Sequence, residues 1–200
     1  MANANRPAGL VPLEYLDGSP WTGKARMYHI VSTDPNAFAI GDPVVMSGTG
    51  DSAGVAGVTL ATAGFGNAVL GAIVGAAGAV YGGPGAIPGS LETTVVPATK
   101  TRSYYVLVAD DVNIVYSLQE GGAGAALTSA SIGSNANLLS GTNNGYVSGW
   151  LLDNASLNTG STRQLQLLGL VQSSDNAFGA YAKWKVRINY HQYTAGQAGV

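Results

Sequence analysis

The chain has 200 residues, a net charge of −2 and no cysteine. It is long enough to bury a sizeable core, it has neither disulfides nor a zinc–thiolate site, and its charge gives no global attraction to nucleic acid. Only 10% of the residues are Asp, Glu, Lys or Arg, against about 25% in ordinary soluble domains. A surface so poor in charge is covered by uncharged polar side chains or by partner molecules, and we expect both.

The first residues show no helical or strand periodicity. Pro7, Gly9 and Pro12 exclude a helix and a central strand. The start of the chain is polar and lacks the apolar stretch of a signal peptide, so we expect no targeting segment. The predicted organisation is an extended N-terminal arm (1–17), a β domain (18–193) and a C-terminal tail (194–200).

Short runs of alternating or β-branched residues recur through the β domain, separated by Gly, Pro, Asn and Asp. They predict about nine short strands and no long helix. The expected fold is therefore all-β, a single-domain sandwich or barrel with long Gly/Ala-rich loops and extended termini. The predicted strand regions cover residues 24–31, 44–46, 55–61, 69–74, 93–98, the pair at 103–118, 146–152, 162–172 and 182–193.

The stretch 103–120 carries the densest strand signal. Residues 104–108 are apolar on both faces, which favours the centre of a sheet. The following residues alternate, so the stretch predicts a β-hairpin or two nearly collinear strands. Between them, Asp110 and Asp111 are either turn caps or the corner of a metal site. The cap is favoured because no further oxygen ligands lie nearby in the sequence.

Two segments are rich in glycine and alanine, one near 75–89 and one at 121–144. Long loops of this kind are often functional or flexible. Part of the second segment, 125–139, is a weak candidate for a short helix because its Ser and Asn residues disfavour one. The apolar stretch 68–81 is shorter than the roughly 20 residues of a membrane span, so we expect a buried strand and no membrane partner.

The residues do not predict an enzyme, a cofactor or a metal site. His29 lies inside an alternating strand, as structural histidines do, and His191 is too far along the chain to form a metal-ligand spacing with it. The chain has no Gly-x-Ser-x-Gly nucleophile elbow, and its Gly-rich stretches lack the lysine of a phosphate loop. We therefore expect a non-enzymatic protein.

The last predicted strand places basic residues on one face. Its alternation puts Trp184, Val186, Ile188 and Tyr190 on one side, with Trp150 and Trp184 expected in the core. The other side carries Lys183, Lys185, Arg187, Asn189 and His191. The three cations are either a solvated, edge-protecting face or a ridge that meets an acidic partner surface. Both interpretations remain open. Nucleic acid is a weaker candidate because no further arginines or aromatics extend the ridge.

The N-terminal arm is the second candidate contact. It is too apolar for a free tail and too interrupted for a helix, and its prolines reduce the ordering entropy lost on docking. An extended segment can add to the sheet edge of a neighbour. We expect the arm and the tail to contact neighbouring subunits or a larger assembly, with contact residues Arg6, Pro7, Leu10 and Val11 in the arm.

Four stretches resemble small structural proteins of tailed bacteriophages: residues 1–9, 18–21, 105–111 and 182–192. In those phages such proteins look like cement, or decoration, proteins of the capsid. The stretches lie at both ends and in the middle of the chain, but they mark strands and turns, so no binding residues carry over. The Gly/Ala-rich segments 63–89 and 121–144 have no counterpart in the resemblance.

The resemblance implies a structural virion protein on the outer surface of the phage head. Its partners would be the major capsid protein and further copies of itself, as a dimer or trimer, without direct contact with nucleic acid. The alternative is a receptor- or carbohydrate-binding module on the virion surface, suggested by the ten tyrosines and three tryptophans.

Overall fold

The computed structural model describes residues 3–77, 95–194, 196 and 199. Within these ranges it contains thirteen strands and one short 3-10 turn, Ser129–Ser131. The all-β prediction is confirmed, with more strands than the expected nine. Within the same ranges, no helix has the length and hydropathy needed to cross a membrane.

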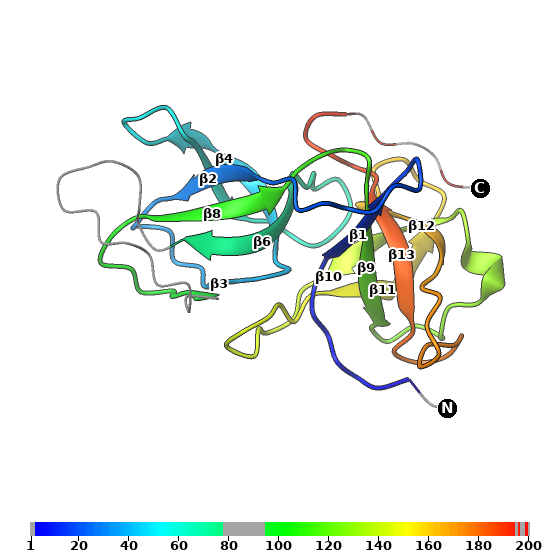
Figure 1. Ribbon diagram of the computed structural model, residues 1–200. Coiled ribbons are helices and arrows are strands. Elements are labelled where there is room, and N and C mark those ends of the chain that lie inside the picture. The colour runs from blue at the N-terminus through cyan, green and yellow to red at the C-terminus, as the bar shows by residue number, and fades with distance from the viewer. Residues whose placement is uncertain (1–2, 78–94, 195, 197–198, 200) are drawn as a thin grey trace.

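The strands form two lobes that lie side by side (Figure 1). The barrel lobe is a closed ring of β2 (Arg26–Ile30), β5 (Ala56–Leu60), β4 (Pro43–Gly50), β6 (Gly71–Ala77) and β8 (Tyr104–Ala109). The six-stranded lobe has the order β1 (Val11–Tyr15), β9 (Ile114–Gly121), β11 (Leu151–Asn158), β10 (Asn135–Leu139), β12 (Leu165–Leu170) and β13 (Lys183–Ile188). Since β1 precedes the barrel and β9 follows it, the barrel is an insertion in the six-stranded lobe.

Strand β8 lies between β2 and β6, as its apolar sequence predicts. Val106 and Val108 are buried in the barrel, whereas Leu107 points outward with 42% of its surface exposed. Strand β9 belongs to the other sheet, so 103–120 is two successive strands and not a hairpin. Asp111 accepts a hydrogen bond from the Asn113 backbone N–H at 2.8 Å, which confirms the turn-cap interpretation for this residue.

Strand β9 is the centre of the six-stranded lobe. One edge of it pairs with β13, and the other pairs with β1 along its first half and with β11 at its end. Its residues are almost all buried, and Tyr116 packs in one cluster with Trp150 and Trp184, as expected for the two tryptophans. The Tyr116 hydroxyl donates to the Ala109 carbonyl at 2.8 Å, which ties β9 to the end of β8.

Several predicted boundaries are wrong. The segment 125–139 holds the 3-10 turn and β10 in place of a short helix. The strand expected at 146–152 begins at Leu151, and Tyr146 is 70% exposed in the preceding loop. The pattern hides β10 because Asn135 and Asn137 are buried in it, and β11 because its polar residues leave Leu152 as its one buried side chain. The two strands are also joined by a side chain, since Ser156 accepts from the Asn137 backbone N–H at 2.7 Å.

The strand expected at 182–193 ends at Ile188. Asn189 and His191, expected on its basic face, are buried instead. The Asn189 side chain donates to the Ser161 and Arg163 carbonyls at 3.1 Å each. His191 forms a parallel bridge with Val69, between the lobes.

The Gly/Ala-rich loop near 75–89 is described only in part. Residues 75–77 belong to β6, and the rest lies outside the described residues. Of the strand expected at 93–98, the described part is β7 (Val95–Val96), which pairs with β3 (Phe38–Ala39) and closes one end of the barrel core.

Candidate functional site

The N-terminal segment is part of the fold and not a free arm. Leu10, predicted as a partner contact, is buried in the core of the six-stranded lobe with 1% of its surface exposed. Its backbone N–H donates to the Gly41 carbonyl at 2.9 Å, and β1 follows directly. Pro12 is tolerated because β1 lies at the edge of the sheet and the register shifts after it. Leu10 is therefore unavailable to a partner.

Residues 3–6 lie against the loop that precedes β13. The Asn3 side chain donates to the Ala177 and Ala180 carbonyls, at 2.8 and 3.0 Å, and accepts from the Ala177 N–H. The Arg6 N–H donates to the Gln119 side chain at 2.7 Å, and the same side chain donates to Asn5 at 2.8 Å. These bonds fix the segment on its own chain and leave the Arg6 side chain exposed.

Three of the seven predicted contact residues, Arg6, Val11 and Lys183, line one groove of about 270 Å³. They meet because β1 and β13 both pair with β9, so that Ser117 is the partner of Val11 on one side and of Lys185 on the other. The groove is lined by Arg6, Ala8, Gly9, Val11, Leu13, Ser117, Gln119, Val171, Ser173, Asp175 and Lys183. We call it the terminal groove. Pro7 does not line it.

Lys185 and Arg187 continue the basic side of the groove along β13, and both are half-buried. Lys185 pairs with Glu14 at 2.7 Å, and the Arg187 Nε donates to the Gln166 side chain at 2.8 Å. A hydrogen bond from Ser173 holds the pKa of Asp175 below its ordinary value, and the charges of Lys183 and Arg6 act in the same direction. The charged residues that line the groove are Arg6, Lys183 and Asp175, so its net charge is +1.

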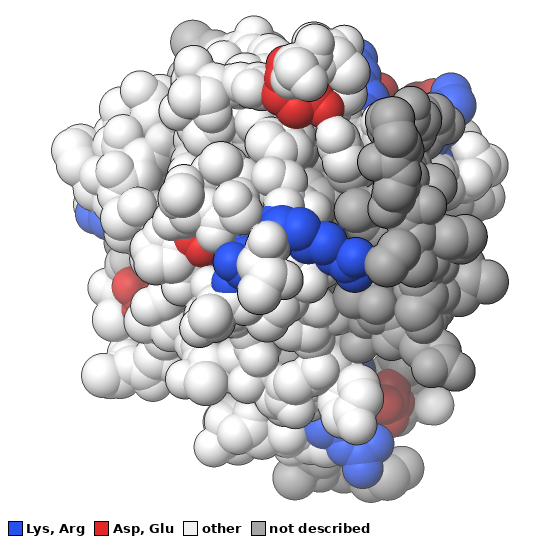
Figure 2. All heavy atoms as spheres, turned by 90° about the vertical axis from the view of Figure 1, so that its left-hand side faces the viewer, with Lys and Arg blue, Asp and Glu red and all other residues white. Residues whose placement is uncertain are grey.

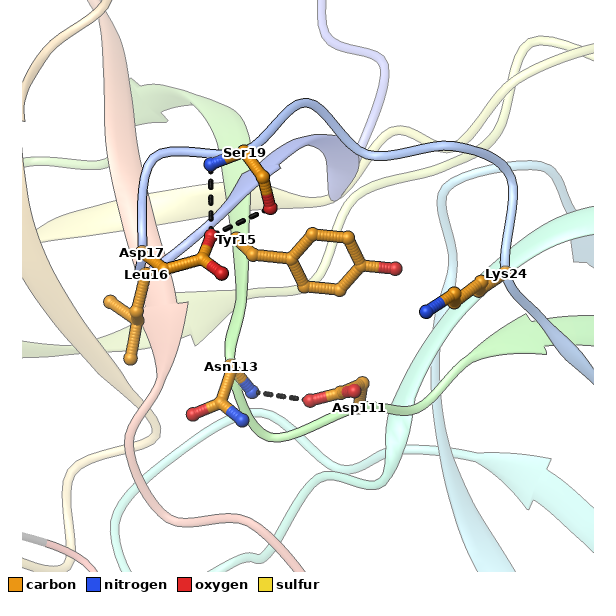
Figure 3. Close-up of a pocket in the computed structure, with 7 residues that line it drawn as sticks. All are labelled: Tyr15, Leu16, Asp17, Ser19, Lys24, Asp111 and Asn113. Atoms are coloured by element: carbon orange, nitrogen blue, oxygen red, sulfur yellow. Dashed lines mark hydrogen bonds between the residues drawn. The ribbon is translucent and has the colours of Figure 1, made fainter.

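A second pocket, of about 620 Å³, was not predicted (Figure 3). It lies where the chain crosses between the lobes, once after β1 and once before β9. The residues that line it are Tyr15, Leu16, Asp17, Ser19, Lys24, Asp111 and Asn113. In the sequence, the residues after β1 and the residues before β9 each indicate only a polar turn. No local pattern indicates that the two turns lie side by side.

The two histidines lie in buried positions. His29 is in β2, with its ring 5.5 Å from that of Tyr105. Burial lowers the pKa of His191, and the charge of Asp110 opposes this shift. Within the described ranges, no three His, Asp or Glu side chains form a group that could hold a metal ion.

The charged residues are few on the face of the barrel lobe shown in Figure 2. Among the described residues of this view, a short band of Lys and Arg side chains crosses the centre, and a few other charged side chains are scattered over a largely uncharged surface. Large exposed hydrophobic side chains occur on both lobes, including Phe65 at 64% and Tyr146 at 70%.

Comparisons with protein-family models, with curated proteins and with solved structures find no match to this chain.

Proposed function

We propose that this protein is a structural virion protein, a cement protein that binds the outer surface of a bacteriophage head and stabilises contacts between capsomers. Its partners are the major capsid protein and further copies of itself. The proposal rests on the resemblance of four stretches of the sequence to such proteins, and on the features of the terminal groove.

The observation that carries the proposal is the convergence of the two chain ends in the terminal groove. Arg6 and Val11 come from the beginning of the chain and Lys183 from its end, and all three line one concavity. Its apolar wall of Val11, Leu13 and Val171 lies beside a net positive charge. An extended acidic segment of a capsid subunit would complement both features, because its backbone fits a groove and its carboxylates meet the cations.

The low charge of the chain also supports the proposal. A protein with 10% charged residues has little charge to keep copies apart, so dense packing on a shell costs little electrostatic repulsion. Each copy needs only a modest affinity, because a repeating lattice multiplies weak contacts.

The test is binding of purified protein to phage heads that lack it. The variant Arg6→Glu/Lys183→Glu reverses two charges in the terminal groove. We expect it to weaken binding by at least about 10-fold, because like charges face the acidic partner. Wild-type binding should also weaken as salt rises.

The matched control is Lys24→Glu/Arg102→Glu, which makes the same change in net charge at two exposed cations outside the groove. It should bind heads like the wild type. Equal binding of both double variants would show that the terminal groove does not contact the head. Failure of the wild-type protein to bind any phage head would contradict the proposed function.

A further inference from the structure

Figure 3 shows the pocket at the crossing between the lobes, here called the Tyr15 pocket. The Tyr15 ring stands at its centre, with Asp17 and Ser19 on one side and Asp111 and Asn113 on the other. Lys24 faces the ring from the far end, with its Nζ 5.9 Å from the ring centroid. One pocket thus combines an aromatic face, two carboxylates, an amide and an ammonium group.

Much of the hydrogen-bonding capacity of this pocket is uncommitted. Asp17 uses one oxygen to accept from the Ser19 N–H and hydroxyl, at 2.8 and 2.6 Å. Asp111 uses one oxygen for the Asn113 N–H. Among the described residues, the second oxygen of each carboxylate and the side-chain amide of Asn113 have no hydrogen-bond partner.

The Tyr15 hydroxyl adds a further unsatisfied group. It is shielded from solvent and has no hydrogen-bond partner among the described residues, and Figure 3 shows it turned toward Lys24. A buried hydroxyl without a partner is costly, so a ligand hydroxyl that reached it would be favoured.

The mixture of groups selects one class of ligand. A divalent cation is disfavoured because Lys24 shares the pocket, and a phosphate is disfavoured by the two carboxylates. An apolar ligand would leave the polar groups unpaired. A sugar matches the set, because its hydroxyls pair with carboxylate, amide and ammonium groups while its C–H face packs on the negative face of an aromatic ring.

We infer that the Tyr15 pocket is a carbohydrate-binding site, which stacks a sugar ring on Tyr15 and holds its hydroxyls with Asp17, Asp111 and Asn113. Its volume of about 620 Å³ lies within the range of roughly 300–1,000 Å³ that is usual for ligand pockets. This activity goes beyond the proposed attachment to the capsid, and it is testable on the isolated protein.

The test is an NMR titration of the full-length, ¹⁵N-labelled protein with glucose, galactose, mannose, N-acetylglucosamine, rhamnose and their short oligomers. At least one sugar should shift the backbone signals of residues 15–24 and 111–113. The variants Asn113→Ala and Lys24→Gln should each weaken that binding at least about 10-fold, because each removes a charged or bidentate partner.

The matched control is Arg102→Gln, since Arg102 lies 5.7 Å from the Tyr104 ring in the same relation as Lys24 to Tyr15. It should bind the sugar like the wild type, and the amide spectrum of each variant reports its folding. The inference is overturned if no sugar shifts these signals, if the shifts fall elsewhere, or if CaCl₂ alone reproduces them. It is also overturned if the pocket variants and the control bind equally.

Discussion

Gln164 shows how one buried polar side chain joins the two lobes. Its side-chain oxygen accepts from the backbone N–H groups of Gly64 and Leu138, at 2.9 and 3.1 Å. Its side-chain nitrogen donates to the carbonyls of Thr62 and Asn67, at 2.9 and 3.0 Å. The loop between β5 and β6 is thereby held on the six-stranded lobe by a fully used amide.

Replacing Gln164 with leucine should therefore be severely destabilising. It keeps the size of the side chain but leaves the N–H groups of Gly64 and Leu138 and two carbonyls without this partner. The cost is largest, about 1–3 kcal/mol, for the buried Leu138 N–H, and the three part-buried groups add to it. We expect the free energy of unfolding, measured with urea, to fall by at least about 3 kcal/mol. Gln172→Leu, at an exposed position, should change it by less than about 0.5 kcal/mol. Equal effects of the two changes would refute this role for Gln164.

His191 makes stability depend on pH. Burial lowers its pKa below the ordinary value of 6.5, with Asp110 and Asp111 opposing the shift. The folded state therefore takes up the proton less readily than the unfolded state. Above pH 6.5 the ring is neutral in both states and the free energy of unfolding is at its full value. As the pH falls below 6.5, the unfolded state is protonated first, and the free energy of unfolding decreases.

The measurement is urea unfolding of the wild type and of His191→Gln between about pH 7.5 and about pH 5.5. The wild type should lose stability relative to the variant as the pH falls through this range, because glutamine does not titrate. Parallel pH profiles for the two proteins would mean that His191 is not the titrating group.

At the scale of elements, the segment before β1 depends on two glycines that face each other. Gly9 has a φ of +66°, and a Cβ there would lie 2.2 Å from the Gly41 carbonyl oxygen. Gly41 has a φ of +92°, and its Cβ would lie 2.1 Å from the Ala8 carbonyl oxygen. Only residues without a side chain allow the backbones to approach this closely.

Gly9→Ala should therefore cost more stability than Gly18→Ala. Gly18 also has a positive φ, +83°, but no atom lies within 4 Å of its added Cβ. Strain alone predicts about 1–2 kcal/mol for Gly18→Ala, and we expect at least twice that for Gly9→Ala, because a backbone clash adds to it. Thermal unfolding of both variants measures the difference. Similar costs would show that the segment is not tightly packed at Gly9.

Local sequence patterns predict the strands whose core faces alternate cleanly. The leucines of β12 and the tryptophan and valine of β13 place these strands correctly, because their apolar side chains at every second position are buried. Strands β1 and β10 escape prediction because Pro12 and Asn137 look like loop residues, and β11 is predicted only at its first two residues because Ser156 and its neighbours are polar.

Local sequence patterns do not show which strands pair with each other. Residues 104–121 predict two strands but not that the strands belong to different sheets, because pairing depends on segments far away in the sequence. The same limit applies to the candidate sites. The alternation of residues in β13 predicts its basic face. Only the folded structure shows that this face lies near Arg6 and that the two turns meet at the Tyr15 pocket.

At the scale of the whole molecule, the barrel is inserted in the other lobe and bonded to it at several points. Ser148 donates from its N–H to the Ile40 carbonyl, and Val69 donates to the Tyr190 carbonyl, at 2.8 and 2.9 Å. Leu10 and Gln164 make similar links. Two lobes connected in this way should unfold together.

Trp150 and Trp184 lie in the core of the six-stranded lobe and the half-buried Trp21 packs against it, so tryptophan fluorescence reports mainly on that lobe. Far-UV circular dichroism reports on the strands of both lobes. We expect the two signals to give the same urea midpoint. A separate transition seen by circular dichroism would show that the barrel unfolds independently.

The central claim is that this chain coats a phage head through the terminal groove. The most direct measurement is a cryo-electron microscopy map of the intact virion, together with the copy number of the protein in purified particles. The account predicts hundreds of copies on the outside of the shell, with Arg6, Val11 and Lys183 against the capsid surface. Absence of the protein from the mature head, a few copies per particle, or a terminal groove that faces solvent would contradict it.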